Sequence, residues 1–217
     1  MTDERATVDL DVSAMAERDA YKILGSLVIP RPIAFVSTQS AEGRLNCAPF
    51  SFFNAVGYAP PVIALGIEQW DDGREKDTGL NIRRTGEFVV NLVDEALAEK
   101  MNLAAIDFPE EVDEFAEVGL TPAPSVKVAP PGIAESPVRL ECVSRALVQV
   151  GRKHTVAIGE VVCFRVRDDL IDVEKMYVDP DRWQPIGRLI GGDYARIGDR
   201  FGLPRVSLAD WNASKSD

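Results

Sequence analysis

The chain has 217 residues, with 24 Lys or Arg against 35 Asp or Glu, which gives a formal net charge of −11. Its length suits one domain that buries a sizeable hydrophobic core. A strongly acidic chain repels nucleic acid and anionic membrane surfaces, so we expect neither as a partner. Any anion-binding site must therefore be assembled locally, against the field of the whole molecule.

Residues that commonly bind metals or form disulfides are few in this chain. Cys47, Cys142 and Cys163 are too scattered for a disulfide framework or a metal-binding knuckle, so we expect reduced, buried thiols. The single histidine, His154, argues against a histidine-based metal site. The N-terminus lacks the basic and apolar regions of a secretory signal, and no apolar run reaches the about 20 residues of a transmembrane helix. We expect a cytoplasmic protein without a metal.

The hydrophobic pattern predicts strands and helices in a mixed order along the chain. Strands rich in β-branched and aromatic residues are expected at residues 33–38, 45–53, 62–67, 88–93, 139–150 and 156–166. Helices are expected at residues 13–27, 77–85, 94–104 and 109–118. Ser13 and Asp94 are the expected N-caps of the first and third helices, Asp77 or Thr78 caps the second, and Gly86 ends it.

These elements predict the fold class. Long strands without alternating βαβ units favour a mainly β protein, an antiparallel barrel with helices packed against its outside. We expect one domain over residues 1–203 and a C-terminal arm or flexible tail over residues 204–217. Because side chains alternate along a strand, the apolar residues from Leu140 to Val150 should share one face, with Glu141 on the other. Residues 121–136 are rich in proline and should form an irregular excursion.

Hydroxyls and a cation suggest an anion site. Ser37 and Thr38 end the first expected strand, and Lys76 and Thr78 lie at the start of the second expected helix. A helix N-terminus carries a partial positive charge and unpaired N–H groups, which suit a phosphate. Each feature alone also has a plain structural explanation, namely turn-forming hydroxyls and a solvated lysine.

The second expected strand carries groups suited to a flat heterocycle. Asn46 and Ser51 can hydrogen-bond a polar ring edge, while Pro49 and Phe50 offer apolar surface. Pro49 lacks an N–H, so this strand should lie at a sheet edge or contain a bulge. A bulge with packed aromatic residues and no ligand is the alternative.

His154 begins the last expected strand and should lie at the rim of the barrel. A lone histidine there is either a surface residue or a hydrogen-bonding partner of a redox cofactor. The chain lacks the GxGxxG, GxxxxGK[ST] and GxSxG motifs. A classical dinucleotide-binding domain, a P-loop nucleotidase and an α/β-hydrolase are therefore unsupported.

Five blocks of sequence, in order, resemble one protein family. They are residues 31–38 (RPIAFVST), 46–53 (NCAPFSFF), 76–78 (KDT) with 81–82 (NI), 87–91 (EFVVN) and 158–162 (IGEVV). These blocks resemble the flavin reductase-like proteins, whose fold is the FMN-binding split barrel. The branch that includes nitrilotriacetate monooxygenase component B and the flavoredoxins is the most similar. The resemblance covers about residues 20–197, including 191–196 (GGDYAR).

The resemblance implies a six-stranded antiparallel Greek-key barrel that forms a homodimer with FMN at the subunit interface. The residues that it implies for cofactor binding are Arg31, Val36, Ser37, Thr38, Asn46, Ala48, Pro49, Phe50, Ser51, Lys76, Asp77, Thr78 and Asn81. Of these, Ser37, Thr38, Lys76 and Thr78 would hold the phosphate. His154 would be catalytic, beside the nicotinamide of NAD(P)H, although Arg-Lys precedes it here where related reductases carry Gly-Asp.

The implied function is an NAD(P)H-dependent flavin reductase. Hydride would pass to N5 of FMN, and electrons would go on to a partner monooxygenase or another acceptor. Two alternatives use the same site. One is a non-enzymatic FMN electron carrier of the flavoredoxin type, and the other is a flavin-dependent oxygenase with residues 121–136 as a lid.

Overall fold

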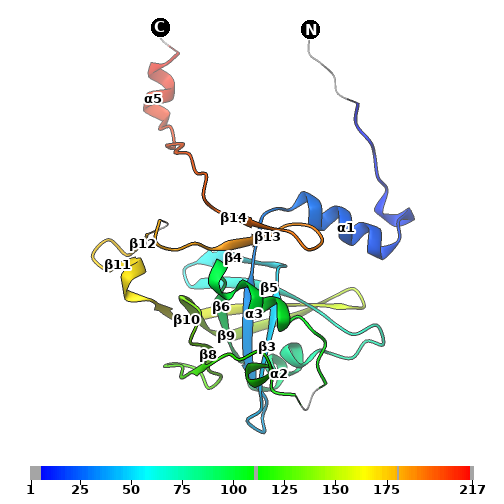
Figure 1. Ribbon diagram of the computed structural model, residues 1–217. Coiled ribbons are helices and arrows are strands. Elements are labelled where there is room, and N and C mark those ends of the chain that lie inside the picture. The colour runs from blue at the N-terminus through cyan, green and yellow to red at the C-terminus, as the bar shows by residue number, and fades with distance from the viewer. Residues whose placement is uncertain (1–5, 110–111, 180, 216–217) are drawn as a thin grey trace.

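The computed structural model describes residues 6–109, 112–179 and 181–215. Its largest sheet has seven strands in the order β3-β2-β6-β9-β10-β5-β4, and every neighbouring pair is antiparallel (Figure 1). The strands are β2 (Ala34–Gln39), β3 (Leu45–Phe50), β4 (Phe53–Tyr58), β5 (Pro61–Glu68), β6 (Glu87–Leu92), β9 (Val138–Val150) and β10 (His154–Val166). The expected mainly β, antiparallel class is confirmed.

The expected strand over residues 45–53 is wrong, because the chain changes its pairing partner inside it. β3 pairs with β2, whereas β4 pairs with β5 at the opposite end of the strand order. Only Ser51 and Phe52 connect β3 to β4. Because this two-residue connection spans only about 10 Å, the two ends of the sheet must curl toward each other. This connection closes the barrel and adds β4 to the six expected strands.

The hydrophobic core has two parts, one on each side of β2. The first fills the barrel interior, and its fully buried members include Val36, Leu65 and Phe88. The second lies between the outside of the barrel and the helices, and it includes Phe35 and Phe115. Since β2 is covered on both faces, its residues are nearly all buried.

The helices are α1 (Glu17–Leu27), α2 (Asp77–Thr85), α3 (Ala98–Leu103), α4 (Glu114–Glu117) and α5 (Leu208–Ala213), with 3-10 turns at η1 (Val12–Ala14), η2 (Glu95–Leu97) and η3 (Asp168–Leu170). The predicted end of α2 is confirmed, since Gly86 follows it with a φ of 75°. Asp94 is also confirmed as a cap, and its Oδ1 accepts from the Leu97 N–H at 3.0 Å.

Two cap predictions and one helix prediction are wrong. Ser13 lies in η1, where Asp11 is the cap, and α1 starts only after Ala16. The N-cap of α2 is Lys76, and its side chain makes no capping hydrogen bond. The helix expected at 109–118 is reduced to the four residues of α4; residues 110–111 lie outside the described part of the chain.

Short strands form three further small sheets. β1 (Arg31–Pro32), β13 (Ile186–Arg188) and β14 (Tyr194–Arg196) form one, β7 (Pro122–Ala123) pairs with β8 (Gly132–Ile133), and β11 (Ile171–Asp172) pairs with β12 (Tyr177–Val178). The segment after β14 leads to α5, which buries no residue and extends away from the barrel (Figure 1).

The predicted common face from Leu140 to Val150 is wrong. A register shift between Ile158 and Gly159 skips one residue of β9. Leu140 therefore faces the barrel interior, whereas Val150, beyond the shift, is 52% exposed. Glu141, expected on a polar outer face, is fully buried because the excursion at residues 121–136 covers it, and its carboxylate accepts the N–H groups of Val126 and Lys127.

Two of the three cysteines are buried as expected. Cys47 and Cys142 are inaccessible, and Cys163 is half-buried. Burial raises the pKa of the Cys142 thiol to about 12, so this thiol stays protonated at neutral pH. Among the described residues, no helix is long and apolar enough to cross a membrane, and no cluster of side chains could hold a metal ion.

Candidate functional site

A cavity of about 130 Å³ lies between the edge strand β3, the start of α2 and residues 104–108. We call it the β3–α2 groove. The predicted cofactor residues that line it are Asn46, Ala48, Pro49, Phe50, Lys76, Asp77 and Thr78. Sites that enclose a whole small-molecule ligand usually measure roughly 300–1,000 Å³. The groove therefore accommodates one part of a larger ligand, such as a phosphate and the groups next to it.

A buried network of amides and hydroxyls forms the floor beside the groove. The Asn46 amide nitrogen donates to the hydroxyl oxygens of Thr38 at 3.1 Å and Thr78 at 3.0 Å. The Asn81 amide nitrogen donates to Thr38 at 3.0 Å. Each threonine hydroxyl accepts these bonds and keeps its own proton for a further acceptor. The network fixes the first turn of α2 against β2 and β3.

Lys76 places a positive charge at the groove. Its Nζ lies 3.0 Å from Oδ1 of Asp107 and 4.4 Å from the centre of the Trp70 ring. The cation–π contact and the ion pair hold the ammonium group beside the N-terminus of α2. The side chain of the N-cap residue Lys76 makes no capping hydrogen bond, so the first N–H groups of α2 and the Lys76 ammonium together favour an anion here.

In the described part of the chain the outer edge of β3 pairs with no strand, which agrees with the prediction from Pro49 of an edge strand or a bulge. β3 is the first strand of the sheet order, so it is an edge strand. Along this edge Pro49 has no N–H, and the backbone N–H of Cys47 acts on the carboxyl group of Glu114 and lowers its pKa. The edge beside Pro49 and Phe50 is therefore a flat apolar surface with few unsatisfied donors.

Glu114 is a site residue that the sequence analysis missed. It is the first residue of α4, its side chain is 9% exposed, and its Oε2 has no hydrogen-bond partner among the described residues. Desolvation, with smaller effects from Asp77 and Asp113, raises its pKa to about 7. In sequence it belongs to an acidic run, which is typical of a solvated surface. Only the packing of α4 against β3 buries it.

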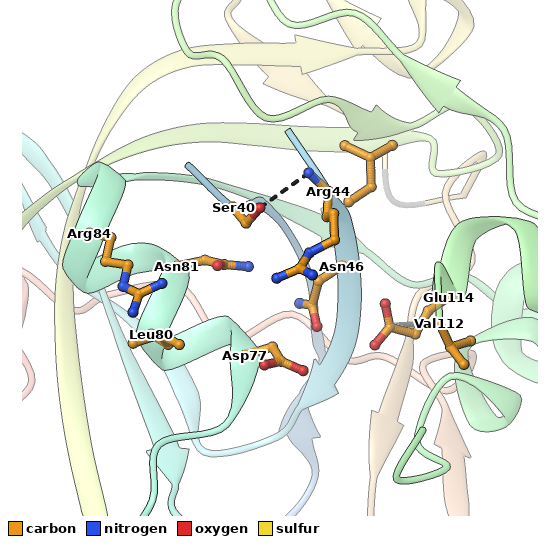
Figure 2. Close-up of a pocket in the computed structure, with 10 residues that line it drawn as sticks. Ser40, Arg44, Asn46, Asp77, Leu80, Asn81, Arg84, Val112 and Glu114 are labelled. Atoms are coloured by element: carbon orange, nitrogen blue, oxygen red, sulfur yellow. Dashed lines mark hydrogen bonds between the residues drawn. The ribbon is translucent and has the colours of Figure 1, made fainter. Parts of the chain in front are cut away.

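A second, smaller cavity of about 20 Å³ lies behind the groove, with room for about one water molecule (Figure 2). Asn46, Asp77 and Glu114 line both cavities. Figure 2 shows the carboxyl group of Glu114 directed toward Asn46 and Asp77, with Arg44 close by. Glu114 therefore lies between the groove and this inner cavity.

Two predicted residues on β2, Val36 and Ser37, do not line the groove. The Ser37 hydroxyl donates to the Pro131 carbonyl at 2.6 Å and accepts from the Asn91 amide at 3.1 Å. Its neighbour Thr38 faces the Asn46 network, because successive side chains alternate across a strand. Val36 lies in the barrel interior with no exposed surface.

Arg31 and Ser51 also lie apart from Lys76. The guanidinium of Arg31 is buried, and it donates to the carbonyls of Val28 at 3.1 Å and Leu189 at 2.8 Å and to that of Gly25. Its Nε lies 3.3 Å from the hydroxyl oxygen of Ser51. Arg31 thus joins the end of α1 to the turn between β13 and β14.

His154 lines a different cavity of about 670 Å³, between α1 and the turn that joins β9 to β10. It is exposed at the start of β10 and pairs across the strands with Glu68. Tyr21 and Phe52, whose rings meet edge to face at 6.2 Å, line the same cavity. Within one chain, His154 and Lys76 therefore line separate cavities.

Comparison with known proteins gives the family. The family model described as "Flavin reductase like domain" matches residues 25–182. This chain belongs to the flavin reductase-like family. It is 38% identical over 205 residues to an uncharacterized protein of Halalkalibacterium halodurans, covering 92% of this chain and 97% of that one.

Two solved structures extend the comparison. Nitrilotriacetate monooxygenase component B from Bacillus cereus has a TM-score of 0.88 and 35% identity, with 92% of this chain and 100% of that chain covered. The 2-nitrobenzoate 2-nitroreductase NbaA from Pseudomonas fluorescens has a TM-score of 0.85 and 35% identity, with 93% of this chain and 98% of that chain covered. Both neighbours share the split-barrel fold of this chain, and the family implies that the chain binds a flavin.

Proposed function

We propose that the protein is an NAD(P)H-dependent FMN reductase that passes electrons to a partner monooxygenase or another acceptor. One observation carries the proposal: in a flavin reductase-like chain, Lys76 and the uncapped N-terminus of α2 meet at the β3–α2 groove. In an acidic molecule this groove assembles donors for an anion. The similarity to a monooxygenase reductase component, at 35% identity over nearly the whole chain, supports the same activity.

The phosphate of FMN fits the donors at the start of α2. Lys76 supplies a charge-assisted hydrogen bond, Thr78 supplies its hydroxyl proton, and the first N–H groups of α2 add their partial charge. Asn46 and Asn81 hold these groups in place through the buried network with Thr38. To bind phosphate, Lys76 exchanges the carboxylate of Asp107 for the phosphate oxygens.

The isoalloxazine ring fits along the outer edge of β3. Ala48, Pro49 and Phe50 offer apolar surface that excludes water from one face of a flat ring. When bound, FMN supplies the hydride acceptor, and the chain supplies binding and orientation. The side chains of Val36, Ser37, Arg31 and Ser51 do not line this groove.

A homodimer is part of the proposal. Apolar side chains are exposed on the outer face of the sheet and on α1; they include Tyr21, Leu24, Val56, Val148 and Val150. Exposed apolar side chains on one side of a molecule favour association with another surface. A second copy would complete a groove that encloses only part of a flavin, and the partner's His154 would then reach the nicotinamide there.

The dimer is tested by light scattering coupled to size-exclusion chromatography. Val150→Lys places a charge on the apolar face, and Val173→Lys changes another exposed valine, in the turn between β11 and β12. We expect the first variant to elute as a monomer and the second to behave as the parent protein. A monomeric parent protein would contradict the dimer.

The activity is tested with purified protein and added FMN. We expect FMN to bind, with a change in its absorption spectrum, and NADH or NADPH oxidation to depend on FMN. Absence of FMN binding would overturn the proposed function. Binding without oxidation of either nucleotide would favour the electron carrier.

A second candidate function comes from the similarity to 2-nitrobenzoate 2-nitroreductase. This chain is 35% identical to that enzyme and also 35% identical to the monooxygenase component. In this alternative the bound flavin reduces a small organic substrate directly, without a partner protein. Nucleotide oxidation that increases when a nitroaromatic acid is added would favour it. Oxidation that is stoichiometric with free FMN would favour the reductase.

A further inference from the structure

Glu114 is a buried acid that the proposed flavin chemistry does not require. Its side chain is 9% exposed, yet Oε2 has no hydrogen-bond partner among the described residues. The backbone N–H of Cys47 lowers the pKa of this carboxyl group, but its effect is smaller than that of burial. A buried carboxylate oxygen without a donor is expensive, so such a group is usually neutral or faces a ligand. Glu114 also lines the β3–α2 groove, so its side chain lies beside any ligand bound there.

The charged groups near Glu114 come from several elements of the fold. Asp77 of α2 and Asp113, next to it in sequence, are the acidic neighbours that raise its pKa. Arg44 and Arg84 line the inner cavity on the other side. Across the groove, Lys76 is already paired with Asp107. Burial raises the pKa of Glu114 to about 7.

An anion bound in the groove raises the pKa of Glu114 further. A phosphate dianion beside Glu114, Asp77 and Asp107 brings more negative charge to a site that is already acidic, with Lys76 as the nearest compensating cation. A protonated Glu114 removes one negative charge from the site. It also gives the carboxyl group a proton that can be donated to a ligand oxygen.

We infer that Glu114 is a binding residue of the β3–α2 groove that acts as a neutral acid, donating its carboxyl proton to an anionic ligand such as the phosphate of FMN. The inference rests on the proposed function, since it assigns the phosphate of FMN to this groove. It means that the protein takes up a proton when it binds the ligand at neutral or alkaline pH. Affinity should therefore fall as the pH rises above the pKa of Glu114.

The size of the effect follows from linkage. If only the protonated form binds, the apparent Kd rises by about 50-fold between pH 7 and pH 9 for a pKa of about 7. In this range the phosphate of FMN is already a dianion, because its second pKa is about 6. The slope therefore reports on Glu114.

The test is fluorescence titration of FMN, from pH 7 to pH 9, with the full chain. Glu114→Gln keeps the size of the side chain and supplies a donor that does not titrate. Glu117→Gln, on the exposed side of the same helix, makes the same charge change away from the groove. We expect the Kd of the parent protein and of Glu117→Gln to rise steeply with pH, and the Kd of Glu114→Gln to stay flat. The Kd of riboflavin, which has no phosphate, should depend less on pH than the Kd of FMN.

Calorimetric titration of FMN in two buffers of different ionisation enthalpy measures the proton directly. We expect uptake of up to one proton by the parent protein at pH 8 and none by Glu114→Gln. Equal slopes and equal proton uptake in both proteins would overturn the inference and leave the reductase proposal intact, with Oε2 satisfied by water. Absence of FMN binding at every pH would overturn both. Weak pH-independent binding by all proteins would also reject the role of Glu114.

Discussion

Replacing Glu114 by glutamine should stabilise the ligand-free protein at neutral and alkaline pH but not in acid. The carboxyl group has a pKa of about 7 in the folded protein against 4.5 for an unperturbed glutamate. Because the folded pKa is the higher one, the folded protein binds more protons than the unfolded chain between these values. The free energy of unfolding therefore falls as the pH rises from about 4.5 to about 7, and it levels off above.

The magnitude follows from the difference between the two pKa values. Each unit corresponds to about 1.4 kcal/mol, which sets an upper limit of about 3 kcal/mol. Solvent partly screens the carboxylate and lowers this upper limit, so we expect a loss of stability of about 2 kcal/mol in the parent protein. Glutamine removes the charge and keeps an acceptor oxygen at the same position. The free energy of unfolding of Glu114→Gln should therefore be about 2 kcal/mol higher than that of the parent protein at pH 8, and equal to it at pH 4.5.

Urea unfolding at pH 4.5, 6 and 8, followed by tryptophan fluorescence, measures this difference. Glu117→Gln is the matched control, because it removes a carboxylate from the exposed side of α4. A gain in stability for Glu114→Gln that is the same at all three pH values would refute the reasoning. The same conclusion would follow if the control behaved as Glu114→Gln does.

Three further variants test the groove and the barrel. Lys76→Ala should weaken FMN binding by about 1.5–3 kcal/mol, the range for a hydrogen bond to a charged group; unchanged affinity in a fluorescence titration would remove Lys76 from the phosphate site. Asp107→Asn should tighten FMN binding by up to about 1 kcal/mol, because it frees Lys76 from a surface ion pair; weaker binding would mean that Asp107 helps to position the lysine. Gly159→Ala should destabilise the fold by about 1–3 kcal/mol, since its Cβ would lie 2.5 Å from Cζ of the buried Phe88. Gly198→Ala, where no atom lies within 4 Å, is the control, and equal thermal unfolding of the two variants would contradict that steric clash.

Much of the local structure could be predicted because it depends on residues close together in sequence. Asp94 caps the turn that follows it, and Gly86 ends α2 with a positive φ that other residues rarely adopt. Pro49 cannot donate to a sheet ladder, and it does lie in an edge strand. Lys76 and Thr78 meet Asn46 as expected, since they start a helix that packs against the first hairpin.

Other features depend on which segments pair in three dimensions. Residues 45–53 have the composition of one strand, and only the closure of the barrel divides them into β3 and β4. The residue skipped in β9 reverses the faces of Leu140 and Val150, and alternation alone contains no sign of it. Such shifts are set by the curvature that a closed sheet needs.

The amino-acid sequence by itself determined the antiparallel strands, the family and the group of residues at the start of α2, because each depends on the composition of short segments. The environment of individual polar side chains was decided only by the tertiary structure. Ser37 is turned to Pro131, and Glu114 is buried against β3, by contacts between segments that are distant in sequence. Burial controls both the hydrogen-bond partners and the pKa of such groups, and burial is a property of the packed molecule.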